Sequence, residues 1–165
     1  MTIRRSKPLD CHPAGAITAK MRIAGPSRPQ PERVGVLMGY LIVRIQEDFD
    51  DAPTQVMAAL KTEGCGVLTE VDGKDALKKK LDVDFRPYKI LGACHPPPAY
   101  RALSAAPEIG LLLLCKVTDA YIAENVSQVS IIDPLSMMGF VQHPDLEPVG
   151  EEARTRLDWV AAALA

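Results

Sequence analysis

The sequence predicts an α+β domain in which helices pack on one face of an antiparallel β-sheet. Several runs of β-branched and apolar residues follow one another with short links, which favours antiparallel pairing. The two longest segments with helical periodicity lie near the two ends of this region, which favours packing both of them on one face. The expected order is β-α-β-(α)-β-(α)-β-β-α over residues 38–165, with the shorter helices in parentheses.

The first strand and the first helix have clear signals. Met38–Gln46 is rich in β-branched and aromatic residues, which is typical of a strand. Asp50 or Asp51 can cap the helix that follows, and Pro53 suits its first turn, where a missing N–H costs nothing. Gly64 can adopt the left-handed conformation that ends a helix. We therefore expect a helix between these signals.

The middle of the chain is expected to contain a second strand, a short basic helix and a third strand: Cys65–Val71, Lys74–Leu81 and Phe85–Cys94. Leu77 and Leu81 are four residues apart, so we expect them on the inner face of the helix. The run of lysines at 78–80 is interpreted as a solvated outer face near the helix C-terminus, where cations offset the helix dipole, rather than as an anion site.

The second half is expected to contain a helix, two strands and a C-terminal helix: Ala99–Ala105, Ile109–Val117, Gln128–Ile132 and a helix ending at Leu164. Ile109–Val117 is apolar on both faces, which predicts a central, covered strand. Asp133-Pro134 breaks the last strand, and a loop is expected at Leu135–Gln142. The buried stripe of the last helix is predicted to be Ala153, Leu157, Val160, Ala161 and Leu164.

An N-terminal arm of residues 1–37 is expected to be disordered. Residues 1–36 hold five of the fourteen prolines and no periodic apolar face, so burial cannot offset the entropy of ordering. They also carry seven basic and two acidic side chains, a net charge of +5, which is interpreted as a solvated segment. An alternative is that translation starts at Met38, which would leave this arm unmade.

Charge and composition argue against several classes of function. The whole chain carries −2, so subtracting the +5 of the first 36 residues leaves −7 for residues 37–165, which opposes nucleic-acid binding. The longest apolar run, Ile109–Cys115, is far shorter than the ~20 residues of a membrane helix. Four cysteines show no CxxC spacing and no secretory signal precedes them, so reduced thiols in the cytoplasm are expected.

Cys94 and Cys115 are the candidate reactive or ligand-binding pair. Cys94 ends one predicted strand and Cys115 lies in a neighbouring one, so pairing of the two strands would bring the thiols together. A reactive thiol needs a cation or helix N-terminus that lowers its pKa, and His95, Arg86 and Arg101 are near Cys94 in sequence. The alternative is packing, because free cysteine is among the most buried residue types.

A metal site at Cys94, His95 and Cys115 is a further hypothesis. Zinc sites usually show paired ligands such as C-x₂-C, whereas Cys94 and His95 are consecutive and would alternate across a strand. Arg86 could clamp an anion, although an ion pair with a carboxylate such as Asp84 is favoured. Arg86 and Asp133 complete the candidate ligand-site residues, although Asp133, before Pro134, is expected to cap or turn the chain.

Longer motifs resemble one family. They are GVLTEVD at 66–72, the block from Leu77 to Cys94 with the proline at 97, GLLLLC at 110–115, and Asp133-Pro134-Leu135. Over about residues 38–165 the chain resembles the domain of unknown function 302 family. The resemblance implies an α+β domain similar to the TATA-binding-protein-like fold, often a homodimer, with no established activity. The chain departs from the usual residues of the family at Cys65, His95 and Lys116.

Two hypotheses of function follow. The first is a non-catalytic cytoplasmic binding or accessory module, expected to be a homodimer, without nucleic-acid or membrane partners and with an unknown small-molecule or protein ligand. The second is a thiol-dependent sulfur, redox or metal-binding protein that uses Cys94 and Cys115. No cofactor follows from the sequence.

Overall fold

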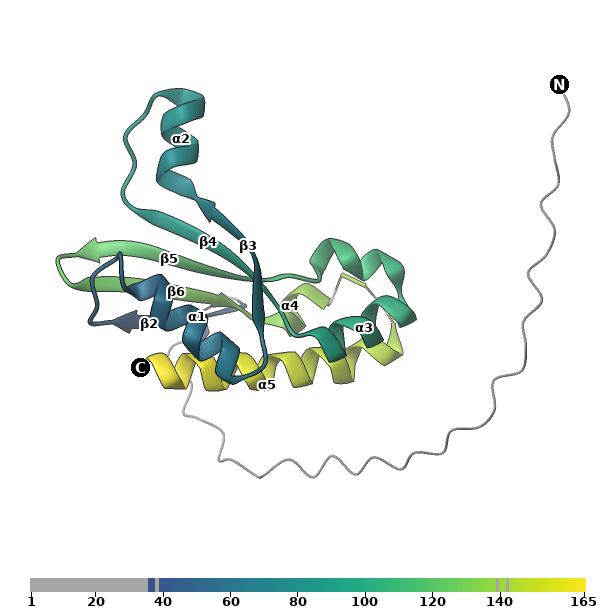
Figure 1. The fold of residues 1–165 in the computed structure, drawn as a ribbon. Coiled ribbons are helices and arrows are strands. Elements are labelled where there is room, and N and C mark those ends of the chain that lie inside the picture. Colours follow the sequence, from purple (N-terminus) through teal and green to yellow (C-terminus); the bar gives the residue numbers. More distant parts are fainter. Residues whose placement is uncertain (1–35, 38, 139, 142) are drawn as a thin grey trace, which may run out of the picture.

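The computed structural model describes residues 36–37, 39–138, 140–141 and 143–165, so the predicted N-terminal arm lies outside the description except for Val36 and Leu37. In the described part, six antiparallel strands form one sheet in the order β1-β2-β6-β5-β4-β3, which confirms the α+β prediction (Figure 1). The strands are β1 (Val36–Leu37), β2 (Tyr40–Ile45), β3 (Gly66–Asp72), β4 (Tyr88–Cys94), β5 (Cys115–Ala123) and β6 (Val126–Ile132). The helices are α1 (Ala52–Thr62), α2 (Gly73–Leu81), α3 (Pro96–Ala105), α4 (Pro134–Met138) and α5 (Glu147–Leu164), with 3-10 turns η1 (Pro107–Leu112) and η2 (Pro144–Leu146).

Helices α1 and α5 cover one face of the sheet, as the sequence predicts. In β2 the side chains of Leu41, Val43 and Ile45 are buried on this face, and the register places Leu41 opposite Ile131 and Val43 opposite Val129. These strand residues form one core cluster with Val56 and Leu60 of α1 and with Leu157, Val160, Ala161 and Leu164 of α5. Four of the five residues predicted for the α5 stripe are therefore buried, and Ala153 is half-buried.

A second apolar cluster lies where α3, η1, η2 and α5 meet, and it explains one wrong prediction. The expected strand Ile109–Val117 is instead a 3-10 turn to Leu112 followed by β5 from Cys115. Ile109 is buried with Ala102, Leu146 and Val149, whereas Leu111 is 89% exposed. An apolar run of this length fits a strand or a helical turn equally well by pattern, and packing against α3 decides.

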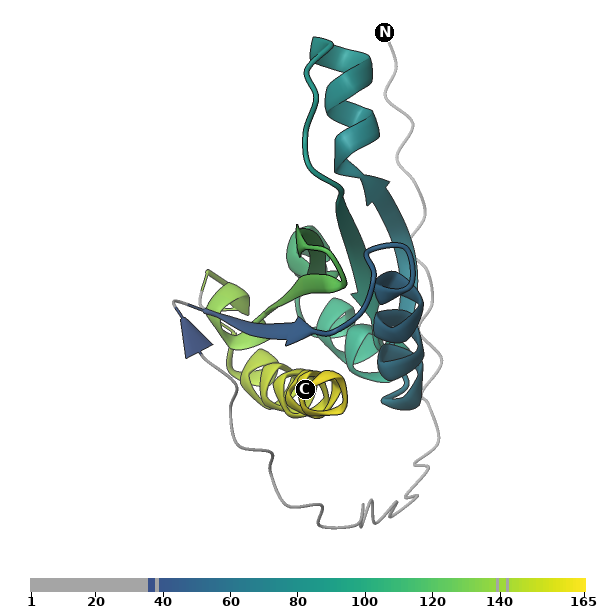
Figure 2. The ribbon, with the colours of Figure 1, turned by 90° about the vertical axis from the view of Figure 1, so that its left-hand side faces the viewer.

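Helix α2 also differs from the prediction. It stands away from the rest of the domain on the hairpin of β3 and β4 (Figures 1 and 2). All nine of its residues are described and none is buried; Leu77 is half-buried and Leu81 is 65% exposed, so the expected inner face is only partly covered. A capping bond from the Asp75 N–H to the Asp72 carboxylate, at 2.8 Å, begins the helix.

The expected loop at Leu135–Gln142 begins instead with the short helix α4. Asp133 starts this helix, because its side chain accepts a hydrogen bond from the Leu135 N–H at 3.0 Å and its carbonyl accepts one from the Ser136 N–H at 3.1 Å. The turn predicted for Asp133 is therefore present, and the chain continues from it into a helix. None of the described helices is both long and apolar enough to cross a membrane.

Candidate functional site

A small cavity lies at the end of the sheet where β4 runs into α3, bounded also by η1, α4 and α5. Its volume, measured as the space open to the centre of a water molecule, is about 40 Å³. Most of its wall is apolar, and five sulfur-bearing side chains contribute to it: Cys65, Cys94, Cys115, Met137 and Met138. We call it the sulfur-lined cavity.

Strand pairing brings the three cysteines to this cavity. Cys115 begins β5 and its strand partner on β4 is Ala93, the residue before Cys94. Cys94 in turn pairs with Gly66 at the start of β3, directly after Cys65. The prediction that the strands of Cys94 and Cys115 are neighbours is correct, and Cys65 joins them because β3 pairs with β4. All three are free thiols.

His95 also lines the cavity, although consecutive residues of a strand point to opposite faces. The strand ends at Cys94, and His95 is the residue that precedes α3, whose first turn is formed by the three prolines. Its ring lies against Gly64, which has φ of +76°, and a Cβ at Gly64 would come within 2.9 Å of His95 Nε2. His95 Nδ1 is buried and has no hydrogen-bond partner among the described residues.

The thiols of the cavity are held in the protonated form. Burial raises the pKa of Cys94, and burial likewise raises the pKa of Cys65 although Arg156 opposes it. Burial, with the neighbouring Cys65 and Cys94, raises the pKa of Cys115 to about 12. An activated nucleophile needs the opposite direction, so at neutral pH these side chains present uncharged, polarisable sulfur to the cavity.

An ion-pair cluster lies beside the cavity. Glu152 of α5 pairs with Arg101 of α3 and, at 3.3 Å, with Arg156, whose guanidinium also donates to the Glu63 carbonyl at 3.2 Å. Burial alone would raise the pKa of Glu152, but its two arginine partners outweigh burial and lower it. Burial, followed by Arg156, lowers the pKa of His95, so its imidazole is neutral at pH 7.

Arg86 and Asp133 do not join Cys94. Arg86 lies before β4, at the opposite end of that strand from Cys94, with its guanidinium 5.8 Å from the centre of the Phe85 ring. Asp84 forms an ion pair with Lys78, at 3.5 Å, in place of the expected pair with Arg86. Asp133 pairs with Arg154 at 3.6 Å and caps α4, so the structure gives it a structural role.

The metal hypothesis gains no support from this geometry. Among the described residues, no three His, Cys, Asp or Glu side chains come together in a way that could hold a metal ion. Cys94, His95 and Cys115 share the wall of one cavity without forming such a set.

Sequence reasoning missed Met137 and Met138 because α4 was expected to be a loop. It also missed a second buried polar group. Asp119 of β5 is fully buried, and neither of its carboxylate oxygens has a hydrogen-bond partner in the described part of the chain. Burial raises its pKa to about 6. The Ser127 hydroxyl, which lies nearby but outside hydrogen-bond geometry, and then the charge of Lys89, the strand partner of Asp119 on β4, oppose the rise. The sequence signal that could have revealed this buried group is an acidic residue within a run of β-branched residues.

The profile of a protein family described as Domain of unknown function DUF302 matches residues 41–164. The chain belongs to the DUF302 family. The sequence-based resemblance is thereby confirmed. A search of curated proteins gives no match.

Among solved structures, this DUF302 chain is similar to an uncharacterized conserved protein DUF302 from Bacillus stearothermophilus. The TM-score is 0.71 and the sequence identity is 24%, with 78% of this chain and 100% of that chain covered. At this identity the likeness concerns the fold, and it adds nothing about a ligand or a reaction.

Proposed function

We propose that this domain is a non-catalytic binding module that takes a small, weakly polar ligand into the sulfur-lined cavity. The observation that carries the proposal is the cavity itself, whose wall is almost entirely apolar and sulfur-bearing, with His95 as a polar group on it. Binding sites for small molecules commonly have this composition, in which a few polar groups orient a ligand within an apolar pocket.

The size of the cavity limits the ligand. A single water molecule needs roughly 10–15 Å³ on the same measure, so about 40 Å³ suits a ligand of a few heavy atoms. Thiols and thioethers are polarisable and interact well with polarisable ligands. Because the raised pKa values keep the thiols protonated, their role in the proposal is contact rather than nucleophilic attack.

Thiol-dependent sulfur chemistry is the second candidate, and the meeting of three thiols at one cavity favours it. It requires a change that lowers a thiol pKa, because burial has the opposite effect on all three. A homodimer, a cytoplasmic location and the lack of a nucleic-acid partner stay predictions from the sequence.

Xenon tests the cavity, because apolar cavities of this kind bind it. We expect saturable xenon-induced shifts of the methyl signals of Met137 and Met138 in the NMR spectrum of the whole chain. The variant Ala153→Leu adds three carbons to a half-buried position on the cavity wall and should abolish these shifts. Ala162→Leu makes the same change at an exposed position of the same helix and should preserve them.

Circular dichroism verifies that both variants are folded. Shifts that never saturate, or that survive unchanged in folded Ala153→Leu, would show that the cavity is not a binding site. Loss of the shifts in Ala153→Leu alone would support the proposal and would justify screening small sulfur-containing and other weakly polar molecules in the same assay.

A further inference from the structure

His95 carries a buried ring nitrogen that the fold leaves without a partner. This residue precedes the first turn of α3, where a short polar side chain commonly caps a helix, yet its imidazole makes no capping hydrogen bond. Nδ1 is buried and has no hydrogen-bond partner in the described part of the chain. A buried polar atom without a partner costs free energy, so a bound molecule that pairs with Nδ1 would offset that cost.

The orientation of the ring turns Nδ1 away from Gly64. A Cβ at Gly64 would come within 2.9 Å of Nε2 and 3.1 Å of Cδ2, so the ring edge formed by these two atoms faces that residue. In an imidazole ring, Nδ1 is the atom opposite this edge. The wall of the sulfur-lined cavity includes His95 together with Cys94 before it and Ala99 after it, so the chain around Nδ1 borders the cavity.

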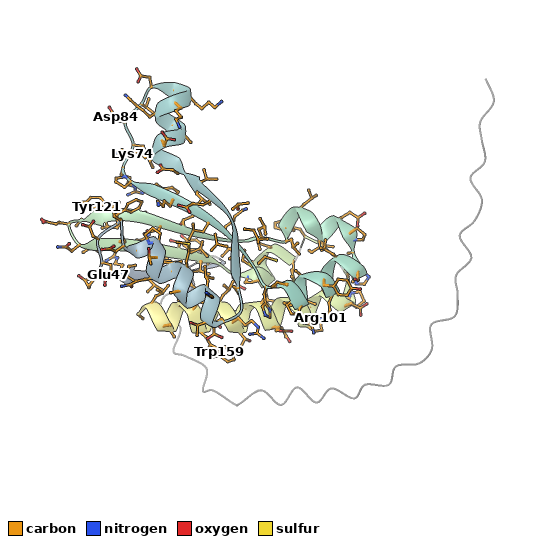
Figure 3. The ribbon with its side chains drawn as sticks, viewed as in Figure 1. Glu47, Lys74, Asp84, Arg101, Tyr121 and Trp159 are labelled. Atoms are coloured by element: carbon orange, nitrogen blue, oxygen red, sulfur yellow. The ribbon has the colours of Figure 1, made fainter. Side chains whose placement is uncertain are left out.

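The electrostatics of the cavity favour a neutral ligand. The wall is mostly apolar, and an ion in such surroundings is costly without a paired charge. The cations beside the cavity already have a partner, because Arg101 and Arg156 both pair with Glu152. Figure 3 labels Arg101 where α3 lies beside α5. Burial and then Arg156 lower the pKa of His95, so its ring brings no charge to the cavity at pH 7.

Hydrogen-bonding capacity narrows the class of ligand further. Among the described residues of the wall, His95 alone has a side-chain nitrogen or oxygen. A buried water molecule usually makes about three hydrogen bonds, and protonated thiols are weak partners, so water matches this wall poorly. An alcohol meets the same difficulty, because its hydroxyl is costly to bury with hydrogen bonds unmade. A thiol loses less, since its S–H is a weak donor and its sulfur a weak acceptor.

We propose that the ligand of the sulfur-lined cavity is a small neutral thiol, of the size of methanethiol, whose S–H group forms a hydrogen bond with His95 Nδ1. This inference rests on the proposed function, because it names the class of ligand and the residue that orients it. A thiol suits either neutral form of the ring: its S–H donates to an unprotonated Nδ1, and its sulfur accepts from an Nδ1–H. The rest of the molecule contacts the polarisable thiols and thioethers of the wall.

Binding of matched ligands to the whole chain tests the assignment. Methanethiol, ethane and methanol each have two heavy atoms, and saturation of the Met137 and Met138 methyl shifts under reducing, oxygen-free conditions gives a dissociation constant for each. We expect methanethiol to bind about three- to tenfold more tightly than ethane, the range of one net hydrogen bond. It should bind about fivefold or more tightly than methanol, which loses stronger hydrogen bonds to water. The ¹⁵N signal of His95 Nδ1 should shift with methanethiol and stay unchanged with ethane.

The variant His95→Leu removes the ring nitrogens and keeps a side chain of similar size. The preference for methanethiol over ethane should disappear, whereas ethane and xenon should still bind because neither pairs with Nδ1. His143→Leu makes the same change at a histidine that is not part of the cavity wall, and it should keep the preference. Circular dichroism verifies that both variants fold, and the Nδ1 signal of the parent gives a test that needs no variant.

The outcomes separate this inference from the proposed function. Three results would each overturn the inference and leave the cavity a binding site for xenon: no preference for methanethiol over ethane, a preference that survives in folded His95→Leu, or an unchanged Nδ1 signal at saturating methanethiol. Absence of saturable binding by both xenon and methanethiol would overturn the proposed function, and the inference with it.

Discussion

The two ends of β4 lie in opposite environments. At its C-terminal end Leu91, Gly92, Ala93 and Cys94 are all buried and lead into the sulfur-lined cavity, whereas the residues that lead into its other end, 81–86, are all exposed. The seven residues of β4 therefore connect the buried interior of the domain to a segment, 81–86, that stays exposed to solvent. The contrast teaches that this small domain carries two separate candidate surfaces, the sulfur-lined cavity and the exposed segment 81–86. A substitution should therefore affect the stability of the domain differently at each.

The largest expected effect is a loss of stability at Leu91, which is compared with the same substitution at Leu81. Leu91→Ala removes a fully buried side chain from the core and should lower the free energy of unfolding by about 2–5 kcal/mol. Leu81→Ala removes the same atoms from a side chain that is 65% exposed. It should change the free energy of unfolding of the monomer by less than about 0.5 kcal/mol. Urea denaturation at low protein concentration measures both. Similar losses would mean that Leu81 is covered within its own chain.

The next effect concerns Asp119, whose folded pKa of about 6 lies above the ordinary value of 3.8. A raised pKa means that the folded state holds the proton more tightly, so this carboxyl group favours folding fully below pH 3.8 and progressively less as the pH rises through 6. The contribution is at most about 3 kcal/mol, from a shift of about two units. Asp119→Asn should therefore become more stable relative to the parent as the pH rises from 4 to 7.

Urea denaturation of parent and variant at several pH values gives this difference directly. Asp84→Asn is the matched control, because it makes the same change at a carboxyl group that is 89% exposed. A constant difference between Asp119→Asn and the parent would show that Asp119 does not titrate in this range. That result would mean that Lys89 or a bound water stabilises the carboxylate in the folded domain.

Local signals in the sequence predicted most of the fold. The strand at Tyr40–Ile45 is rich in β-branched and aromatic residues, and α1 lies between Asp51 and Gly64, so both elements follow from residues in or next to them. The Asp51 side chain, however, makes none of the capping hydrogen bonds that the sequence suggested. The wrong predictions depend on distant contacts. The apolar run after Pro107 becomes a 3-10 turn because Ile109 packs on α3 and η2, and the Leu77–Leu81 spacing of α2 is helical even though no core lies beneath it.

The candidate site was predictable in part for the same reason. Cys94 and Cys115 come together through the pairing of adjacent strands, which the order of elements indicates. Cys65 and the two methionines reach the cavity only through the edge pairing of β3 and the position of α4, which no local pattern specifies. The raised thiol pKa values follow from burial, a property of the packed domain, whereas the sequence showed only nearby cations.

A smaller effect is expected at Gly64, which connects α1 to the cavity through His95. Gly64→Ala places a Cβ at φ of +76°, which costs roughly 1–2 kcal/mol, and that Cβ would come within 2.9 Å of His95 Nε2. Gly66→Ala is the control, because a Cβ there meets nothing within 4 Å. We expect a loss of stability and a shifted His95 ring signal in the NMR spectrum for Gly64→Ala. Equal behaviour of both variants would show that His95 is not held against Gly64.

The smallest signal is expected from alkylation of the cavity thiols near neutral pH. It compares the buried end of β4 with the exposed helix α2 most directly. Cys65, Cys94 and Cys115 all have pKa values raised by burial, so native alkylation should be slow at pH 7 and should accelerate only above pH 9, with Cys115 last because its pKa is about 12. The substitution Ala76→Cys adds a thiol at an exposed position of α2; this thiol should label at the ordinary rate of a free thiol and serves as the internal standard. Mass spectrometry of quenched samples assigns each site. Labelling of Cys94 with a midpoint below 9 would contradict the burial argument and would favour thiol chemistry over passive ligand binding, since only a thiolate attacks an electrophile at a useful rate.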